Sequence, residues 1–161
     1  MSEIIIREIE VRDNEIIANL IRQVLVELGA PKVGTAYEDE ALKSLSEVYL
    51  APKAVYYVFE EYGKILGGAG IAPLENAKAT VCELQKMYFL PEARGKGYGA
   101  KLMQKCLITA KEFGYEKCYL ETLPYMKAAV KLYEKTGFVA LSAPIGDTGH
   151  YSCSKWMIKE L

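Results

Sequence analysis

The sequence has no excess of charge of either sign. Its 161 residues include 20 Lys plus Arg and 21 Asp plus Glu, so the formal net charge is −1. A nucleic-acid-binding domain usually shows a clear basic excess or a basic stripe, whereas the strongest basic cluster here is the pair Arg94 and Lys96. We therefore expect no nucleic-acid partner.

Long hydrophobic runs are also missing. The N-terminal residues 1–7 (Met-Ser-Glu-Ile-Ile-Ile-Arg) contain no basic region followed by a long apolar stretch, as a secretion signal would. No segment of the chain is apolar over the length that crosses a bilayer. We expect a cytoplasmic protein without a membrane partner.

The sequence has little metal-binding chemistry. It has one histidine and four cysteines, and the cysteines are scattered singly, without a CxxC pair, in apolar or strand-like surroundings. Such cysteines are typical of buried reduced thiols rather than of a disulfide or zinc framework. We expect no metal cofactor.

The composition suits one compact domain. Hydrophobic residues make up 51% of the chain, and 161 residues are enough to bury a core without disulfides or metals. We therefore predict a single domain over residues 1–161.

Hydrophobic periodicity predicts alternating strands and helices. The expected strands are 4–9, 54–60, 65–71, 80–89, 118–121, 138–141 and 155–158, and the expected helices are one capped by Asp13 that ends at Gly29, then 38–48, 97–113 and 126–136. A right-handed crossover through the helix 97–113 makes the flanking strands parallel. The prediction is a mixed α/β (α+β) fold, with a mostly antiparallel central sheet of six to seven strands flanked by about four helices.

The most informative segment is Arg94-Gly95-Lys96-Gly97-Tyr98-Gly99, between an expected strand and an expected helix. Loop N–H groups and the positive end of a helix together suit an anion such as a diphosphate. Missing side chains at the three glycines let phosphates approach the backbone, and Arg94 and Lys96 add positive charge. A tight turn without a ligand is the simpler alternative.

A dinucleotide-binding fingerprint is a second alternative. Gly95, Gly97 and Ala100 fit the pattern GxGxx(G/A), and Glu121 stands where a ribose-binding acid belongs. However, residues 91–94 separate the strand from the first glycine, and an antiparallel meander precedes the loop. Neither feature belongs in a doubly wound parallel sheet, so this alternative ranks well behind.

The segment Arg94 to Gly99 resembles the (Q/R)xxGx(G/A) diphosphate loop of the GNAT superfamily of acetyl-CoA-dependent N-acetyltransferases. Residues 132–138 (Leu-Tyr-Glu-Lys-Thr-Gly-Phe) resemble the signature of the last core helix of that family. The resemblance is specific over about 81–138 and implies the acyl-CoA N-acyltransferase fold. It implies acetyl-CoA as co-substrate and these cofactor-binding residues: Met87, Tyr88, Phe89, Arg94, Gly95, Lys96, Gly97, Tyr98 and Gly99.

The same resemblance implies two catalytic residues. Glu83 stands where several members carry a glutamate base, and strand alternation puts Glu83, Gln85 and Met87 on one face. A base is needed because an amine with a pKa near 10.4 is protonated at neutral pH, and Glu83 would need a raised pKa or a water relay. Tyr133 resembles the tyrosine that meets the departing CoA sulfur. A solvated strand glutamate and a core tyrosine are the simpler alternatives.

The acceptor side is less specific. The resemblance places an acceptor groove between 29–38 and 143–151. His150 is a candidate for substrate contact or proton transfer there, although a single loop histidine is more often incidental. Tyr37, Glu38 and Asp39 are candidates for an acidic, aromatic surface that meets a cationic amine, although charged loop residues are usually just solvated. Met126 stands where many relatives have Asn. The expected function is acetyl transfer from acetyl-CoA to a primary amine of a small molecule or peptide by direct attack in a ternary complex. A catalytically degenerate acyl-CoA-binding or regulatory domain is the alternative, and a homodimer is left open.

Overall fold

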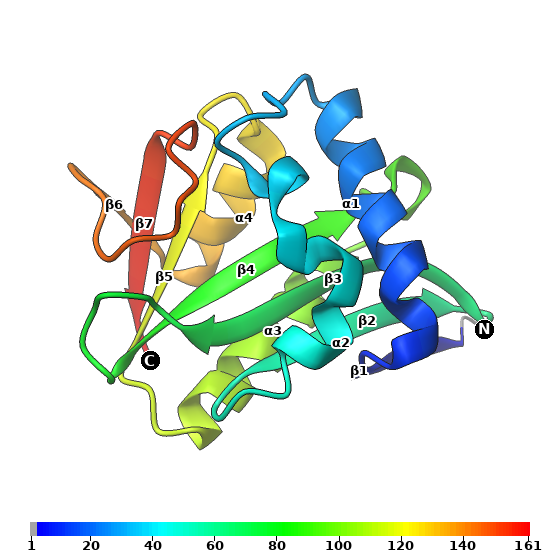
Figure 1. Ribbon diagram of the computed structural model, residues 1–161, viewed down its shortest axis with the longest axis horizontal. Coiled ribbons are helices and arrows are strands. Elements are labelled where there is room, and N and C mark those ends of the chain that lie inside the picture. Colours follow the sequence, from blue (N-terminus) through cyan, green and yellow to red (C-terminus); the bar gives the residue numbers. More distant parts are fainter. Residues whose placement is uncertain (1–2) are drawn as a thin grey trace.

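The computed structural model describes residues 3–161, which contain a seven-stranded sheet with helices on both faces (Figure 1). The strands are β1 (Ile4–Glu8), β2 (Val55–Glu61), β3 (Lys64–Pro73), β4 (Val81–Phe89), β5 (Lys117–Thr122), β6 (Val139–Leu141) and β7 (Lys155–Glu160). The helices are α1 (Asn14–Glu27), α2 (Leu45–Val48), α3 (Tyr98–Glu112) and α4 (Lys127–Thr136). The predicted strand and helix numbers are confirmed.

The strands lie in the order β1-β2-β3-β4-β5-β7-β6. Neighbours are antiparallel except β4 and β5, which are parallel and are joined by the crossover through α3. The predicted mixed, mostly antiparallel sheet is therefore correct. The dinucleotide alternative is wrong, because a doubly wound domain requires a largely parallel sheet.

The core lies between the sheet and the amphipathic helices. The buried side chains of α1 recur at helical spacing, at Ile17, Ile21 and Val24, as a one-sided apolar stripe requires. Helix α3 buries Leu102 and Cys106 in the same way. Helices α1 and α2 cover one face of the sheet, and α3 and α4 cover the other (Figure 1).

Two local predictions are wrong: the helix over 38–48 and the capping of α1 by the Asp13 side chain. The helix expected over 38–48 is broken into two short 3₁₀ turns, Ala36–Glu38 and Glu40–Ser44, followed by the four-residue α2. The break lies at Asp39, whose backbone is extended (φ −60°, ψ 120°) and whose carboxylate is bound to distant side chains. Tertiary contacts have overridden the local helical pattern.

Asp13 occupies the N-cap position of α1, but its side chain does not cap the helix. Its carboxylate instead accepts two hydrogen bonds from Arg7, from Nη1 at 2.8 Å and Nη2 at 3.0 Å. Both carboxylate oxygens are thus engaged by the guanidinium, in a bidentate pair that is charge-assisted on both sides.

Glycines in β3 allow aromatic rings to lie across the sheet. A Cβ added at Gly68 would lie 2.6 Å from Cε1 of Tyr56, and one added at Gly70 would lie 2.7 Å from Cδ2 of the same ring. Side chains at these two positions would therefore collide with the ring. The ring of Tyr56 reaches across β3, and its hydroxyl donates to the Lys86 carbonyl of β4 at 2.8 Å.

None of the helices within residues 3–161 combines the length and the apolar character needed to cross a membrane.

Candidate functional site

The site lies where β4 and β5 separate. Their parallel pairing covers Val81 with Lys117, Cys82 with Cys118 and Glu83 with Tyr119, and then it stops. Beyond this point β4 follows β3 as far as Phe89, whereas β5 follows β7 as far as Thr122. The two strands diverge visibly in Figure 1.

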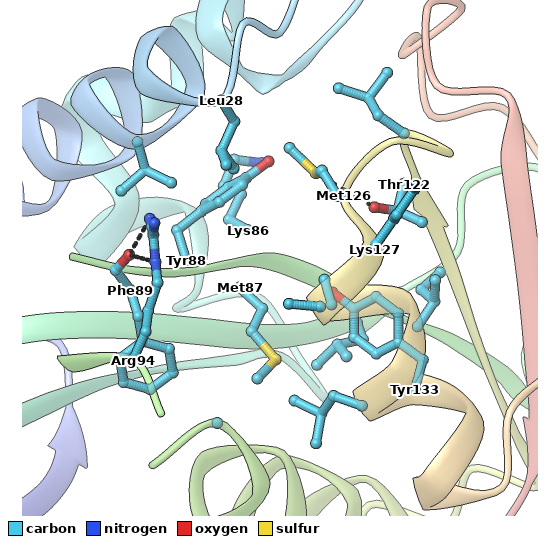
Figure 2. A pocket seen from close by; sticks show the side chains of 18 of the residues that line it. Leu28, Lys86, Met87, Tyr88, Phe89, Arg94, Thr122, Met126, Lys127 and Tyr133 are labelled. Carbon is cyan, nitrogen blue, oxygen red and sulfur yellow. Dashed lines mark hydrogen bonds between the residues drawn. The ribbon is translucent and has the colours of Figure 1, made fainter. Parts of the chain in front are cut away.

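A cavity of about 740 Å³ opens at this separation. Its walls come from β4, β5, α1, α4 and the start of α3, and Figure 2 shows side chains of these elements around it. Of the residues predicted from the sequence, the structure brings these to the wall: Met87, Tyr88, Phe89, Arg94, Gly95, Gly97, Tyr98, Gly99 and Tyr133. Lys96 and Glu83 do not line it.

The glycine loop has the backbone that an anion site needs. Gly95 has φ 77° and Gly97 has φ 80°, left-handed values that glycine adopts without the penalty paid by other residues. A Cβ at either position would meet nothing within 4 Å, so open space faces both. Gly97 is the N-cap of α3 and offers no side chain to the first turn, which leaves the first N–H groups of the helix available to a ligand.

The structural reason for a glycine at position 99 is different. A Cβ added there would lie 3.0 Å from Cδ2 of Leu132 in α4 and 3.6 Å from Cε of Met87. The absence of a side chain therefore lets α3 and α4 approach each other closely.

The charged side chains of the loop, Arg94 and Lys96, interact with other parts of the protein. Arg94 pairs with Glu27 at the end of α1, at 2.8 Å and 2.9 Å, and its Nε and Nη2 donate to the Phe89 carbonyl. The Arg94 side chain thus ties the loop to α1 and to the end of β4. Figure 2 shows its bonds to the Phe89 carbonyl. The Lys96 ammonium lies 5.7 Å from the ring centre of Tyr98, whose hydroxyl donates to Glu61.

A bulge interrupts β4 beside the cavity. Gly68 pairs with Tyr88 and Gly70 with Gln85, so Lys86 and Met87 together oppose the one residue Ala69. Lys86 has φ 50°, a left-handed conformation that costs a non-glycine residue about 1 to 3 kcal/mol. Such strain is held in place by the surrounding structure and clusters at functional sites.

The bulge changes which side chains share a face. Lys86 and Tyr88 extend from β4 to one side, whereas Met87 extends to the other (Figure 2), towards Gly99 of α3. Gln85 instead bonds to Tyr49, directly after α2, and to Glu83. The prediction that Met87 shares a face with Glu83 and Gln85 is therefore wrong, because the extra residue shifts the alternation.

Glu83 is a buried carboxyl group rather than a solvated one. Only 6% of the residue is exposed, and its Oε1 accepts a hydrogen bond from Nε2 of Gln85 at 2.7 Å. Burial raises the pKa of Glu83 to about 7, opposed by the Gln85 bond and assisted by the charge of Glu121. A carboxyl group with this pKa can accept and release a proton at neutral pH.

Tyr133 of α4 is 7% exposed, and its side chain faces the cavity (Figure 2). Burial raises the pKa of its phenol to about 12. Within residues 3–161 no hydrogen-bond partner is assigned to its hydroxyl. The group is therefore a neutral donor that is available to a ligand.

Met126 lies at the N-cap of α4 and lines the same cavity. Its sulfur accepts from the Thr122 hydroxyl at 3.5 Å. Tyr125, the residue before Met126, is half exposed, and its hydroxyl donates to the Gly29 carbonyl at 3.4 Å.

The structure joins His150 and Asp39 to Lys86 in a cluster of three charged side chains on the α1 side of β4, an association that the sequence analysis did not predict. Nε2 of His150 lies 2.9 Å and 3.0 Å from the two carboxylate oxygens of Asp39, and Nζ of Lys86 lies 3.2 Å from Oδ2 of the same group. Burial alone would lower the pKa of His150, but the bond to Asp39 outweighs it and the pKa lies above its usual value. His150 is thus fixed by an ion pair.

The two loops expected to border the acceptor groove lie against each other, because a Cβ added at Gly34 would be 2.7 Å from Cε2 of Tyr151. Just beyond the expected bounds, the Ser152 N–H donates to the Gly34 carbonyl at 2.9 Å and His150 pairs with Asp39. Over residues 3–161 no three His, Cys, Asp or Glu side chains are arranged to hold a metal ion.

Comparison with known proteins agrees with this geometry. A model of the acetyltransferase (GNAT) family matches residues 21–138. A protein of Escherichia coli (strain K12), named an uncharacterized N-acetyltransferase, YjgM, is 43% identical over 158 residues, which are 98% of this chain and 95% of that protein. An IAA acetyltransferase of Azospirillum brasilense is 30% identical over 130 residues, which are 80% of this chain and 83% of that protein.

Solved structures show the same fold. A GNAT-family acetyltransferase from Staphylococcus aureus Mu50 superposes with a TM-score of 0.83 at 22% identity, covering 99% of each chain. The yncA protein of Salmonella typhimurium, solved with its cofactor acetyl-CoA, superposes with a TM-score of 0.77 at 17% identity, covering 99% of this chain and 93% of that one. From the family match over residues 21–138, the relatives and this shared fold, we conclude that the chain belongs to the GNAT family of N-acetyltransferases and is an acyltransferase.

Proposed function

We propose that the protein transfers the acetyl group of acetyl-CoA to a primary amine of a small molecule or peptide, by direct attack of the amine in a ternary complex. The observation that carries this proposal is the separation of β4 from β5, with a titratable buried carboxyl group at its base and a glycine loop at its mouth.

The cofactor would be held mainly by backbone. The N–H groups of residues 95–99 suit the diphosphate, because both left-handed glycines face open space and the first turn of α3 lacks a side-chain cap. Main-chain groups of residues 87–89 that point away from β3 have no partner on β5. Apart from the Phe89 carbonyl, which accepts from Arg94, they suit the pantetheine arm. Arg94, bound to Glu27, would orient the loop rather than supply the main charge.

Amide formation requires a neutral amine. With an ordinary amine pKa near 10.4, almost all of the acceptor arrives protonated, and Glu83 with its pKa of about 7 is matched to removing that proton. Glu83 lies just outside the cavity wall, while its neighbours Leu84 and Lys86 line it. We therefore assign the proton transfer to a water molecule between the amine and Glu83.

The reaction then exchanges one bond for another. The amine nitrogen forms a bond to the carbonyl carbon, the carbon–sulfur bond breaks, and the sulfur leaves as a thiolate. The nitrogen releases its second proton to solvent water, which leaves a neutral amide. Tyr133 donates a hydrogen bond to that thiolate. Full proton transfer is unfavourable, since the pKa of Tyr133 is about 12 and that of an ordinary thiol is about 8.5.

The proposal is tested by measuring thiol release from acetyl-CoA with a panel of amines, together with mass spectrometry of the products. We expect CoA release and a matching acetylated amine for at least one class of acceptor. Tight binding of acetyl-CoA without CoA release above the hydrolytic background would favour the alternative, a catalytically degenerate acyl-CoA-binding domain.

A further inference from the structure

Lys86 lines the cavity, and the fold holds its backbone in the position that directs the side chain there. The bulge puts its side chain on the α1 side of β4, and the Tyr56 hydroxyl holds the carbonyl of the same residue at 2.8 Å. The side chain is only 10% exposed. A lysine is almost never buried to this extent unless its charge is paired.

Lys86 has more N–H donors than assigned hydrogen-bond partners within residues 3–161. An ammonium group has three donors, and within residues 3–161 the one partner assigned to Nζ is Oδ2 of Asp39, at 3.2 Å. Asp39 is shared, because both of its oxygens lie within 3.0 Å of Nε2 of His150. A single carboxylate thus holds two basic groups, and the lysine faces the cavity with donors to spare.

The neighbours of Lys86 in the wall do not complete its bonding. Thr35, Tyr88 and Cys153 line the same side of the cavity, and none of them bonds to Nζ. The other cations in the wall, Arg94, Lys127 and Lys135, belong to the cofactor loop and to α4. On the acceptor side, Lys86 is therefore the cation that a ligand would meet.

Glu83 lies three residues earlier on the same side of β4. At about 3.3 Å per residue, their Cα atoms are at most about 10 Å apart. A ligand with an amine directed towards Glu83 and an anion directed towards Lys86 would match both charges.

We propose that the acceptor is a small amine that also bears a carboxylate, and that this carboxylate pairs with Nζ of Lys86 while Asp39 and His150 hold the ammonium in position. This inference rests on the proposed acetyl transfer. A carboxylate fits better than a phosphate, because one ammonium balances a monoanion, whereas a dianion requires several cations, and Glu121 also lines the cavity.

The test uses the full chain and acceptors that differ only at the anion. Amino acids are compared with their carboxamides, their decarboxylated amines and amines bearing a phosphate, by CoA release. For the wild type, we expect kcat/KM to be at least about tenfold higher for the acid than for the matched carboxamide, as a charge-assisted hydrogen bond provides. In Lys86→Met this ratio falls to about one, chiefly through KM of the acid. In the control Lys101→Met, an exposed helix position, the ratio is unchanged.

A second measurement is independent of turnover. Binding of N-acetylated amino acids and of their carboxamides, which are the products of the proposed reaction, is measured by calorimetry for the same three proteins. We expect the acids to bind the wild type at least about tenfold more tightly than they bind Lys86→Met, and circular dichroism confirms that the variant is folded.

The outcomes separate the two proposals. Turnover of amines with equal or better activity towards carboxamides or phosphates overturns the carboxylate inference and leaves acetyl transfer intact. Binding of N-acetylated acids that depends on Lys86, without turnover of any amine, supports the carboxylate site and refutes acetyl transfer. If Lys86→Met weakens acids and carboxamides equally, Lys86 has a structural role only and the inference is wrong.

Discussion

Replacing Glu83 with Gln tests the assignment of the base most directly. The change keeps the size of the side chain and the oxygen that accepts from Gln85, but it removes the proton-accepting group. General base catalysis contributes about 10²- to 10⁴-fold, so above pH 8 we expect kcat/KM of Glu83→Gln to be at least about 100-fold lower than that of the wild type.

The dependence on pH is the sharper part of this prediction. With a pKa of about 7, half of Glu83 is ionised at pH 7, and only about one molecule in a hundred is ionised at pH 5. The ratio of kcat/KM between wild type and Glu83→Gln should therefore be flat above pH 8, half-maximal near pH 7 and about a hundredth of its plateau value at pH 5. Taking the ratio cancels the titration of the amine itself, because both enzymes meet the same acceptor.

The assay is continuous thiol release at saturating acetyl-CoA with one acceptor across this pH range. Glu112→Gln, at an exposed position of α3, is the matched control and should behave as the wild type. Calorimetry should give the same affinity for acetyl-CoA in all three proteins. A large ratio that does not change with pH would refute the role of Glu83 as a base and leave it a structural role.

The same titration predicts a change in stability. Because folding raises the pKa of Glu83 from 4.5 to about 7, its favourable contribution is complete below pH 4.5 and is lost as the pH rises through about 7. Relative to the wild type, Glu83→Gln should gain about 3 kcal/mol in free energy of unfolding between pH 4 and pH 8. Urea denaturation at the two pH values measures this difference, and an equal difference at both would contradict the raised pKa.

Three further predictions concern the loop, the tyrosine and the ion pair. Gly97→Glu should abolish acetyl-CoA binding in calorimetry, because it brings a negative charge to the expected diphosphate site, whereas Gly97→Asn, which tolerates the left-handed backbone, should retain measurable binding; equal affinities would refute the site. Tyr133→Phe should lower kcat about tenfold, the value of one hydrogen bond to a charged group, without changing the acetyl-CoA affinity, and an unchanged kcat would remove Tyr133 from the reaction. His150→Gln should reduce the free energy of unfolding more at pH 6 than at pH 9, since the raised pKa of His150 means that its pairing with Asp39 is complete below 6.5 and is lost as the pH rises through the folded value; a loss independent of pH would show that the charge does not contribute.

Local sequence determined much of the fold and one half of the site. The strand and helix periodicities were enough for the order of elements and for the parallel crossover through α3, because alternation and helical spacing depend on near neighbours in the chain. The glycine loop was also predicted from the sequence. Gly95 and Gly97 adopt left-handed backbone at the start of a helix, and that requirement is visible in the residue type itself.

The tertiary structure determined the other half of the site. The bulge at Lys86 depends on pairing with β3 and on the Tyr56 hydroxyl, and nothing in the local alternation of β4 predicts the extra residue. Asp39 and His150 are 111 positions apart, so only the folded chain brings them to Lys86 and holds Asp39 out of a helix. The raised pKa of Glu83 follows from burial, which is a property of the surrounding sheet rather than of the residue. The sequence alone predicted the glycine loop because its requirements are local, and the fold determined the charged cluster of Lys86, Asp39 and His150 because electrostatic contacts depend on distance in space.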